Sequence, residues 1–376
     1  MSGRGGGPSR RVLVVGAGLI GTSVALALRE RGHDVWLADV KPDHLRQAEE
    51  LGAGSAHRGE SVDVTVVAVP PGSTAQVIVQ RLNDDQRNTV TDTASIKREV
   101  QQEVERMLDA PSSASHGRAE RITRYVGGHP LAGRERGGPQ RAHPAMFAGR
   151  AWVLTPNAEV SPATLENARW LVTECGATPV TMSAAEHDDA LAVTSHLPQL
   201  LASALAARLA MQPDPVLQLS GQALRDMTRI AAADPSLWAD IATGNALPLA
   251  EAIEGLTTSL RDVAAALRSA PPEPEAVRLL IESGGAGHSR LPGKHGGVPR
   301  SYQIVPVVVP DQPGQLARLL GDAAAAGVNV EDLRVEHAPG LPVGVIELFV
   351  GPESAGVLRT ALAERGWTLS DAAEAS

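Results

Sequence analysis

Short apolar runs alternate with segments of helical periodicity in the first half of the chain. The runs at 11–15, 34–39, 62–70, 88–95 and 124–130 have the length and composition of buried strands. Residues 19–31 show the apolar spacing of a helix, and two further strands are expected at 151–156 and 177–183, around a helix near 161–175. This alternation predicts an α/β domain at 11–183 that is built on a doubly wound parallel sheet.

The pattern changes from about residue 184, where strands give way to long helices. In 186–210, Leu197, Leu201, Leu205 and Leu209 recur at helical intervals, and a second apolar stripe lies within 246–268. We therefore expect an all-α domain at 184–270. Long apolar helices in so small a domain need a partner surface, which a second subunit can provide, so the pattern favours a homodimer.

Three further segments complete the chain. Residues 271–300 are rich in proline and glycine, which predicts a linker with one short helix at 275–282. The order strand–helix–strand–strand–helix at 301–376 indicates an incomplete ferredoxin-like α+β module, with helices at 314–326 and 353–365. Residues 1–10 are polar and glycine-rich, which predicts a disordered tail and no signal peptide.

Composition narrows the class of protein. A net charge of −9 and an aromatic content of 2% argue against a nucleic-acid-binding protein, which needs a basic surface and stacking platforms. No run approaches the roughly 18 apolar residues of a membrane span. Cys175 is the only cysteine, which excludes a disulfide framework and a multi-cysteine metal site. We expect a cytoplasmic protein without a metal.

A glycine motif stands between the first expected strand and the first helix. It consists of Gly16, Ala17, Gly18, Leu19, Ile20 and Gly21. In this context a G-x-G-x-x-G pattern binds a dinucleotide, because the glycines let the pyrophosphate approach the helix N-terminus. Asp39 ends the second strand, where a carboxylate binds ribose hydroxyls and favours NAD over NADP, although Lys41 and Arg46 keep NADP open. With Pro70 at the end of the third strand, these residues predict a Rossmann-type site for NAD.

Two polar clusters fall at the carboxyl ends of later strands, beside the expected cofactor. Ser95 could cap a helix that begins at Ile96 or contact a substrate, and the two interpretations are compatible. His129 lies in GGHPLAGRERGG at 127–138, where Pro130 restricts the histidine to an extended backbone and so fixes the direction of the imidazole. Taken alone, His129 fits a surface turn as well as a binding site.

The helical segment adds a histidine and two arginines. His196 precedes Pro198 by two positions, and Pro198 cannot donate to the carbonyl of Thr194, which predicts a kink in the helix. His196 therefore fits a core position as well as a substrate contact. Arg225 and Arg229 share one helix face at i and i+4, where they could hold a carboxylate or remain solvated.

Taken together, these segments resemble the prephenate dehydrogenase family of tyrosine biosynthesis. The matching segments are GAGLIGTSVALAL, VTDTASIK, GGHPLAGRERGG, FAGRAWVLTP, SHLPQ, LRDMTRIAAADPSLWADI and AIEGL, in family order from about 11 to 268. Near the C-terminus, DQPGQL and GVNV resemble an ACT domain, a small amino-acid sensor. The resemblance implies an oxidoreductase that converts prephenate and NAD to 4-hydroxyphenylpyruvate, carbon dioxide and NADH, with tyrosine as a feedback effector.

The resemblance also implies roles for particular residues. His129 is the base for the substrate hydroxyl, and Ser95 hydrogen-bonds the same hydroxyl and orients His129. His196 contacts the substrate, and Arg229 binds a substrate carboxylate. The other residues expected around the substrate are Arg225, Trp238 and Glu135. The residues expected to be regulatory are Asp311, Pro313, Gly314 and Asn329.

Three alternatives stay open. An arogenate dehydrogenase performs the same chemistry on a substrate with an amino group in place of the keto group, and discrimination would depend on groups near Gln199. A β-hydroxyacid dehydrogenase uses a lysine base, and 184–268 contains no lysine. A non-catalytic amino-acid sensor could keep the nucleotide-binding fold, but the combination of Ser95, His129, His196 and Arg229 argues against it.

Overall fold

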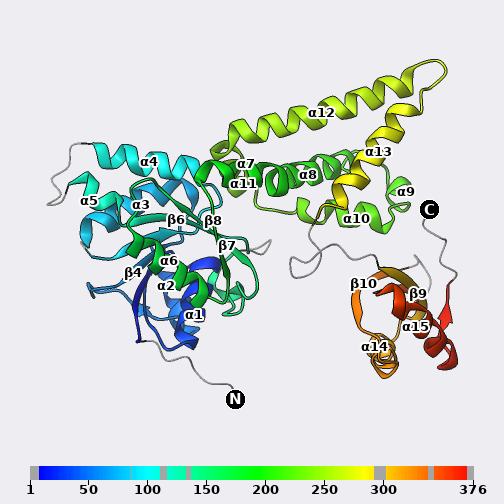
Figure 1. The fold of residues 1–376 in the computed structure, drawn as a ribbon, viewed down its shortest axis with the longest axis horizontal. Coiled ribbons are helices and arrows are strands. Elements are labelled where there is room, and N and C mark those ends of the chain that lie inside the picture. The colour runs from blue at the N-terminus through cyan, green and yellow to red at the C-terminus, as the bar shows by residue number, and fades with distance from the viewer. Residues whose placement is uncertain are drawn as a thin grey trace. The chain divides into compact units, whose positions relative to one another are not determined.

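The computed structural model describes residues 8–85, 87–110, 117–132, 137–291, 302–337 and 343–370, and Figure 1 shows its elements in colours that follow the chain. The chain divides into two compact units, residues 1–258 and 259–376. The first unit contains a large sheet and most of the helical segment, and the second contains the C-terminal module.

The first unit is built on an eight-stranded sheet in the order β3-β2-β1-β4-β5-β6-β7-β8. Its strands are β1 (Arg11–Val15), β2 (Asp34–Ala38), β3 (Ser55–Ala56), β4 (Val64–Val67), β5 (Thr89–Asp92), β6 (Tyr125–Pro130), β7 (Ala151–Pro156) and β8 (Thr178–Thr181). The central strands β4 and β5 are buried along their whole length, because helices cover both faces of a doubly wound sheet. The structure confirms the predicted α/β class.

Helices pack on both faces of the sheet and form two separate cores. One core joins the sheet to α1 and α6 through residues such as Val24 and Leu171, and the other joins it to α3 and α4 through residues such as Ile78 and Val104. The helices of this part are α1 (Leu19–Glu30), α2 (Pro42–Glu50), α3 (Pro71–Asp84), α4 (Arg98–Asp109), α5 (Arg118–Ile122) and α6 (Pro162–Glu174).

One strand departs from the predicted parallel sheet. β7 pairs antiparallel with β6, with His129 opposite Val153, while all other neighbours in this sheet are parallel. A parallel pair needs a crossover connection, usually a helix. Among the described residues between β6 and β7, only a short 3-10 turn at Pro139–Arg141 is helical. The chain therefore returns beside β6 in the opposite direction, and the sheet is mixed.

The helical segment contains more breaks than its periodicity predicts. Its elements are α7 (Ala184–Leu191), a π-helical turn (Ala192–His196), α8 (Leu197–Leu209), α9 (Asp214–Leu217), α10 (Gln222–Thr228), a 3-10 turn (Arg229–Ala231), α11 (Pro235–Gly244) and α12 (Ala246–Arg268). The expected disturbance before Pro198 takes the form of the π-helical turn, and Pro198 itself stands in the first turn of α8. A proline is tolerated there because the first N–H groups of a helix have no partner within it.

Among the described residues, the run Ala184–Leu209 is the one helix that is long and apolar enough to cross a membrane. Its most apolar stretch of 18 residues has a mean hydropathy of 1.3, and 28% of that stretch is buried. The same run carries His187, Asp188 and His196, all buried within the first unit. Its exposed apolar positions include Val193 and Leu201.

The second unit contains a four-stranded antiparallel sheet in the order β10-β11-β9-β12. Its elements are α13 (Glu275–His288), β9 (Gln303–Pro310), α14 (Gln315–Ala325), β10 (Val330–His337), β11 (Val343–Val350), α15 (Pro352–Glu364) and β12 (Thr368–Leu369). The final strand, β12, was not expected, and it completes the βαββαβ order of a ferredoxin-like module. α13 is also longer than the helix predicted at 275–282.

Candidate active site

The three glycines of the G-x-G-x-x-G motif meet different steric demands. Gly16 has a φ of +101°, and a Cβ there would lie 2.3 Å from a backbone oxygen; at Gly21 the corresponding distance is 1.9 Å. A Cβ at Gly18 would meet nothing within 4 Å, and Gly18 precedes α1 without a side-chain cap. The first turn of α1, with Leu19 and Ile20, is therefore open to an anionic group, and the loop fits a dinucleotide pyrophosphate.

Asp39 directs its carboxylate at this glycine loop from the end of β2. Oδ2 accepts a hydrogen bond from Ala17 N at 2.6 Å, and Oδ1 accepts one from Lys41 N at 2.7 Å. A cavity of about 600 Å³ opens beside these residues, lined in part by Lys41, His44 and the segment 137–141. The carboxylate and the cavity lie where the adenosine part of a dinucleotide is bound in this fold.

Buried polar groups hold the backbone next to His129. The fully buried side chain of Lys97 donates to the carboxylate of Asp92 and, at 2.7 Å, to Gly128 O. Asp92 also accepts from the hydroxyl of Tyr125 at 3.0 Å. Burial lowers the pKa of Lys97, and the charge and hydrogen bond of Asp92 oppose this shift. A Cβ at Gly128 would lie 2.5 Å from Asp92 O, so only glycine allows the strands to approach this closely.

A chain of hydrogen bonds joins His129 to α7 and to the N-terminus of α4. His129 Nδ1 lies 2.8 Å from His187 Nε2, and His187 Nδ1 lies 2.7 Å from Asp188 Oδ1. The Asp188 carboxylate accepts two further hydrogen bonds, from Lys97 N at 2.9 Å and from Arg98 N at 2.8 Å. His187 and Asp188 are buried, while His129 is only half-buried.

This environment shifts the pKa values of His129 and Asp188 in the hydrogen-bond chain. Burial lowers the pKa of His129 well below its ordinary value, and His187, Lys97 and His196 lower it further. Burial acts to raise the pKa of Asp188, but hydrogen bonds from His187 and from the backbone of α4 outweigh it, and the pKa is lowered. At neutral pH the site therefore presents His129 as a neutral imidazole and Asp188 as a carboxylate.

His196 belongs to the same cluster. Asn245 Nδ2 lies 3.2 Å from His196 Nδ1 and donates to Asp188 O at 2.6 Å, and the ring of Trp238 stands edge-to-face to His196 with centroids 6.1 Å apart. Burial lowers the pKa of His196, which keeps it neutral, although Asp188 opposes the shift. Because the amide donates to Nδ1, the ring proton resides on Nε2, where it can be donated to a ligand.

Ser95 and Pro70 lie in the loops that follow β5 and β4. The predicted helix start at Ile96 is wrong, because α4 begins at Arg98, and Ser95 is not its cap. The carboxylate of Asp188 takes that role from another element. Within the described residues, the hydroxyl of Ser95 makes no hydrogen bond and stays available to a ligand. Pro70 is exposed and precedes α3.

The predicted arginines lie on two successive helical turns of the first unit. Arg225 is in α10, Arg229 begins the 3-10 turn that follows, and both are exposed. Gln199 Nε2 donates to Ile230 O at 2.9 Å and ties this turn to α8. The structure therefore brings His129, His196 and Trp238 together. Glu135 lies outside the described residues.

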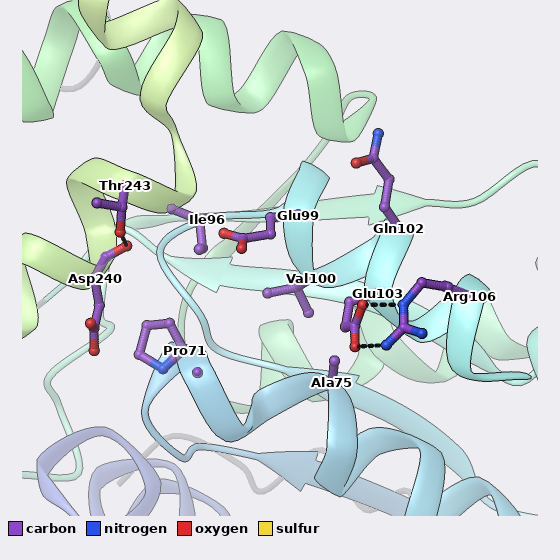
Figure 2. Close-up of a pocket in the computed structure, with 11 residues that line it drawn as sticks. Pro71, Ala75, Ile96, Glu99, Val100, Gln102, Glu103, Arg106, Asp240 and Thr243 are labelled. Carbon is purple, nitrogen blue, oxygen red and sulfur yellow. Dashed lines mark hydrogen bonds and ion pairs between the residues drawn. The ribbon is translucent and has the colours of Figure 1, made fainter.

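A cavity of about 400 Å³ lies between α3, α4 and α11 (Figure 2). Figure 2 shows Glu99 and Asp240 facing it from opposite walls and Glu103 paired with Arg106 at its rim. Among the described residues that line this cavity, none was predicted as a site residue. None of the three histidines of the cluster lines this cavity.

Several residues of the cluster were not predicted as site residues from the sequence. His187 and Asp188 stand in EHDD near the start of the helical segment, where nothing in the local pattern distinguishes them from a solvated helix start. Asn245 follows α11 and Lys97 precedes α4. Their common property is complete burial of a polar side chain, which requires internal partners and which a single sequence does not reveal.

The predicted regulatory residues are exposed positions of the second unit. Asp311, Pro313 and Gly314 lead from β9 into α14, and Gly314 has a φ of +89°. Asn329 follows α14, and its Nδ2 donates to Glu331 Oε1 at 2.6 Å. The two groups lie at opposite ends of an 11-residue helix, about 16 Å long, so they do not form one site within a single copy of the unit.

Two family models match the chain in succession. Residues 24–181 match the model described as prephenate dehydrogenase, nucleotide-binding domain, and residues 183–281 match prephenate dehydrogenase, dimerization domain.

Relatives that cover most of the chain agree with these matches. A probable prephenate dehydrogenase, NovF of Streptomyces niveus, is 35% identical over 370 residues, which cover 95% of this chain and 99% of the relative. The crystal structure of prephenate dehydrogenase from A. aeolicus with hydroxyphenyl propionate and NAD+ is 27% identical, with a TM-score of 0.62 over 74% of this chain and 97% of that one. Synechocystis arogenate dehydrogenase is 25% identical, with a TM-score of 0.61 over 75% of this chain and 100% of that one.

Proposed function

Because the chain belongs to the prephenate dehydrogenase family, we propose that it oxidises and decarboxylates prephenate to 4-hydroxyphenylpyruvate with NAD. The observation that carries this proposal is the state of His129. Its imidazole is neutral, and Nδ1 is held by His187 at 2.8 Å. Nε2 makes no hydrogen bond within the described residues and can accept a proton from a ligand.

The residues of the cluster divide the chemistry among them. Bound NAD supplies the acceptor for the hydride that leaves the ring carbon bearing the hydroxyl group. His129 Nε2 takes the hydroxyl proton, and Ser95 orients the same hydroxyl. The C–C bond to the ring carboxylate then breaks, its electron pair enters the ring to form a phenolate, and carbon dioxide leaves. His129 returns its proton to the phenolate oxygen, which restores the neutral base.

The cofactor preference follows from Asp39. Its carboxylate stands beside the glycine loop and would repel a 2′-phosphate, which supports NAD over NADP. Arg46, one of the two cations that left NADP open beside Lys41, is paired with Asp43 at 2.8 Å, so less of its charge is available to a phosphate.

The test of the substrate is an assay of NADH absorbance with NAD and either prephenate or arogenate. We expect turnover with prephenate. Turnover with arogenate alone would make the chain an arogenate dehydrogenase, a function that the fold accommodates equally because the two substrates share the reacting ring. Turnover with neither, in a sample that binds NAD, would leave the non-catalytic sensor as the function.

Replacement of Arg229 by alanine is expected to raise the KM for prephenate by about 10- to 100-fold with little change in kcat. A charged hydrogen bond to a carboxylate contributes about 1.5–3 kcal/mol, and a carboxylate distant from the reacting carbon is bound equally in the ground and transition states. Steady-state kinetics checks this, with Arg225→Ala beside it. A fall in kcat at unchanged KM would contradict a binding role for Arg229.

The pH dependence follows from the lowered pKa of His129. A base must be neutral, and burial holds its pKa well below the ordinary value, which is about 6.5. We therefore expect kcat/KM to be level from pH 8 down to about 6.5 and to fall only at lower pH, as His129 becomes protonated. An acid limb with an apparent pKa above about 7, or no acid limb, would exclude His129 as the base.

We place the protein in the cytoplasm as a homodimer. Met211, Leu219 and Leu247 expose 87%, 84% and 76% of their surface in the helical part of the first unit. Exposed apolar side chains gathered on one domain favour a subunit interface, and this part of the chain matches the dimerization model.

We also propose that tyrosine regulates the enzyme through the second unit, whose βαββαβ order supports the predicted ACT domain. Deletion of residues 300–376 is expected to leave catalysis in place and to remove any inhibition by tyrosine, because the histidine cluster lies entirely within the first unit. Rate measurements over a series of tyrosine concentrations check this. Inhibition that survives the deletion would place the effector in the active site.

A further inference from the structure

The hydrogen-bond chain behind His129 has a definite direction. Asp188 is a carboxylate that already accepts from two backbone N–H groups, and a carboxylate can only accept. His187 Nδ1, at 2.7 Å from Asp188 Oδ1, must therefore carry a proton. In neutral His187 this leaves Nε2 as an acceptor, so the hydrogen bond of 2.8 Å to His129 is donated by His129 Nδ1–H.

We propose that His187, backed by Asp188, is a positioning residue of the reaction that holds His129 as the tautomer with Nε2 unprotonated. Its role for the substrate rests on the proposed function, whereas the tautomer itself is a property of the protein without substrate. In this tautomer the unprotonated nitrogen is the one that no described residue contacts. The opposite tautomer would present an N–H to the substrate hydroxyl and could not take its proton.

The hydrogen bond between His129 and His187 allows the two imidazoles to share the positive charge that forms in the reaction. When the substrate proton arrives at His129 Nε2, the Nδ1 proton stands 2.8 Å from His187 Nε2. Movement of that proton to His187 leaves His129 neutral and places the cation beside the Asp188 carboxylate. No atom is gained or lost in this step, since one proton enters at Nε2 and one shifts along the hydrogen bond.

Charged and titratable groups face His129 from several elements. His187 and Asp188 lie on α7, His196 on the π-helical turn, and Lys97 before α4, paired with Asp92 of β5. Lys97 and Asp92 form a buried ion pair, in which the two charges balance each other. A neutral His187 is part of the proposal, and the tautomer of His129 tests it.

The decisive measurement is the tautomer of His129, read from imidazole ¹⁵N shifts of the full-length protein without substrate. We expect a protonated Nδ1 and an unprotonated Nε2 in the natural protein. His187→Leu removes the acceptor and should shift His129 toward the form protonated at Nε2. His187→Gln offers an oxygen acceptor near the position of Nε2 and should keep the original tautomer. A protonated Nε2 on neutral His129 in the natural protein would overturn the proposal.

Kinetics gives a second, independent readout. His187→Leu is expected to lower kcat by about 100-fold or more, as a base held in the wrong tautomer does elsewhere, with the KM within about threefold; His187→Gln should recover at least tenfold of the loss. The control is Asp189→Asn, which breaks an exposed pair of 2.9 Å with Arg98 between the same two helices. An equal loss of kcat in this control would assign the effect to helix contact and overturn the proposal.

The outcomes separate this proposal from the function on which it rests. If neither prephenate nor arogenate is oxidised but His129 has the expected tautomer, the proposed function fails and the tautomer assignment stands. If His187→Leu does not fold, as its melting curve would show, the spectra of the natural protein and of His187→Gln still decide the assignment. A His187→Leu variant that turns over at the natural rate would overturn the positioning role.

Discussion

The His129→Asn variant is expected to lose turnover by at least about 10²–10⁴-fold, the usual contribution of a general base, while it still binds prephenate and NAD. Asparagine keeps a polar side chain of similar reach but cannot accept a proton at neutral pH. Because His129 stands in β6, paired with Val153 of β7, the substitution should not disturb the strand. Single-turnover rates and the dissociation constants of both ligands measure the two effects separately.

The result would be read against Ser95→Ala. That variant removes a hydroxyl that orients the substrate but keeps the base, so its loss of kcat should be smaller than that of His129→Asn. A His129→Asn variant with substantial kcat and a greatly raised KM would mean that His129 only binds the substrate. The base would then have to be another group, and His196 is not a candidate in the tautomer in which Nδ1 accepts from Asn245 and Nε2 carries the proton.

Lys97→Met is expected to destabilise the first unit by about 3–5 kcal/mol, because it leaves the buried Asp92 carboxylate without its counter-charge. For a unit of this size, that corresponds to a fall in melting temperature on the order of 10 °C. The variant also frees the carbonyl of Gly128, which Lys97 holds at 2.7 Å. Since His129 is the next residue, kcat should fall even at temperatures where the variant is folded.

Two further variants test the cause of this loss. The double variant Lys97→Met with Asp92→Asn removes both charges and should be more stable than Lys97→Met alone. Arg11→Met, which breaks an exposed pair with Asp63 at 3.0 Å, should change stability by about 1 kcal/mol or less. If Lys97→Met were as mild as Arg11→Met, the buried pair would not stabilise the fold in the way inferred from its burial.

The fold and the outline of the site could be predicted because their signals are local. Apolar runs for β1 and β4, the spacing of α12, and the glycine motif all lie in short stretches whose chemistry requires one structure. The antiparallel β7 was missed because its direction depends on the connection from β6, and strand composition is the same in either direction. β12 was missed because two paired residues carry no periodic signal.

The histidine cluster could be predicted only in part. His129 was identified by its glycine-rich setting and by Pro130, and His196 by the neighbouring proline. His187 and Asp188 contact residues 58 and 90 positions away in the sequence. The spacing of residues within a helix does not predict contacts between segments so far apart. For the same reason Ser95 was taken as a possible cap for α4, whereas the cap comes from α7.

The attachment of Asp188 to α4 also determines which substitutions the site can tolerate. Asp188 is held by the main-chain N–H groups of Lys97 and Arg98 and by no side chain of α4. A change of the side chain at 98 would keep this main-chain hydrogen bond, although it would remove the contacts of Arg98 with Ala185 O and Asp189 of α7. Proline is the exception: it is ordinarily favoured at the first position of a helix, but at 98 it would remove an N–H on which the alignment of the base depends. α4 therefore serves the site through the main-chain N–H groups of residues 97 and 98, while its buried side chains, such as Val104, serve the core.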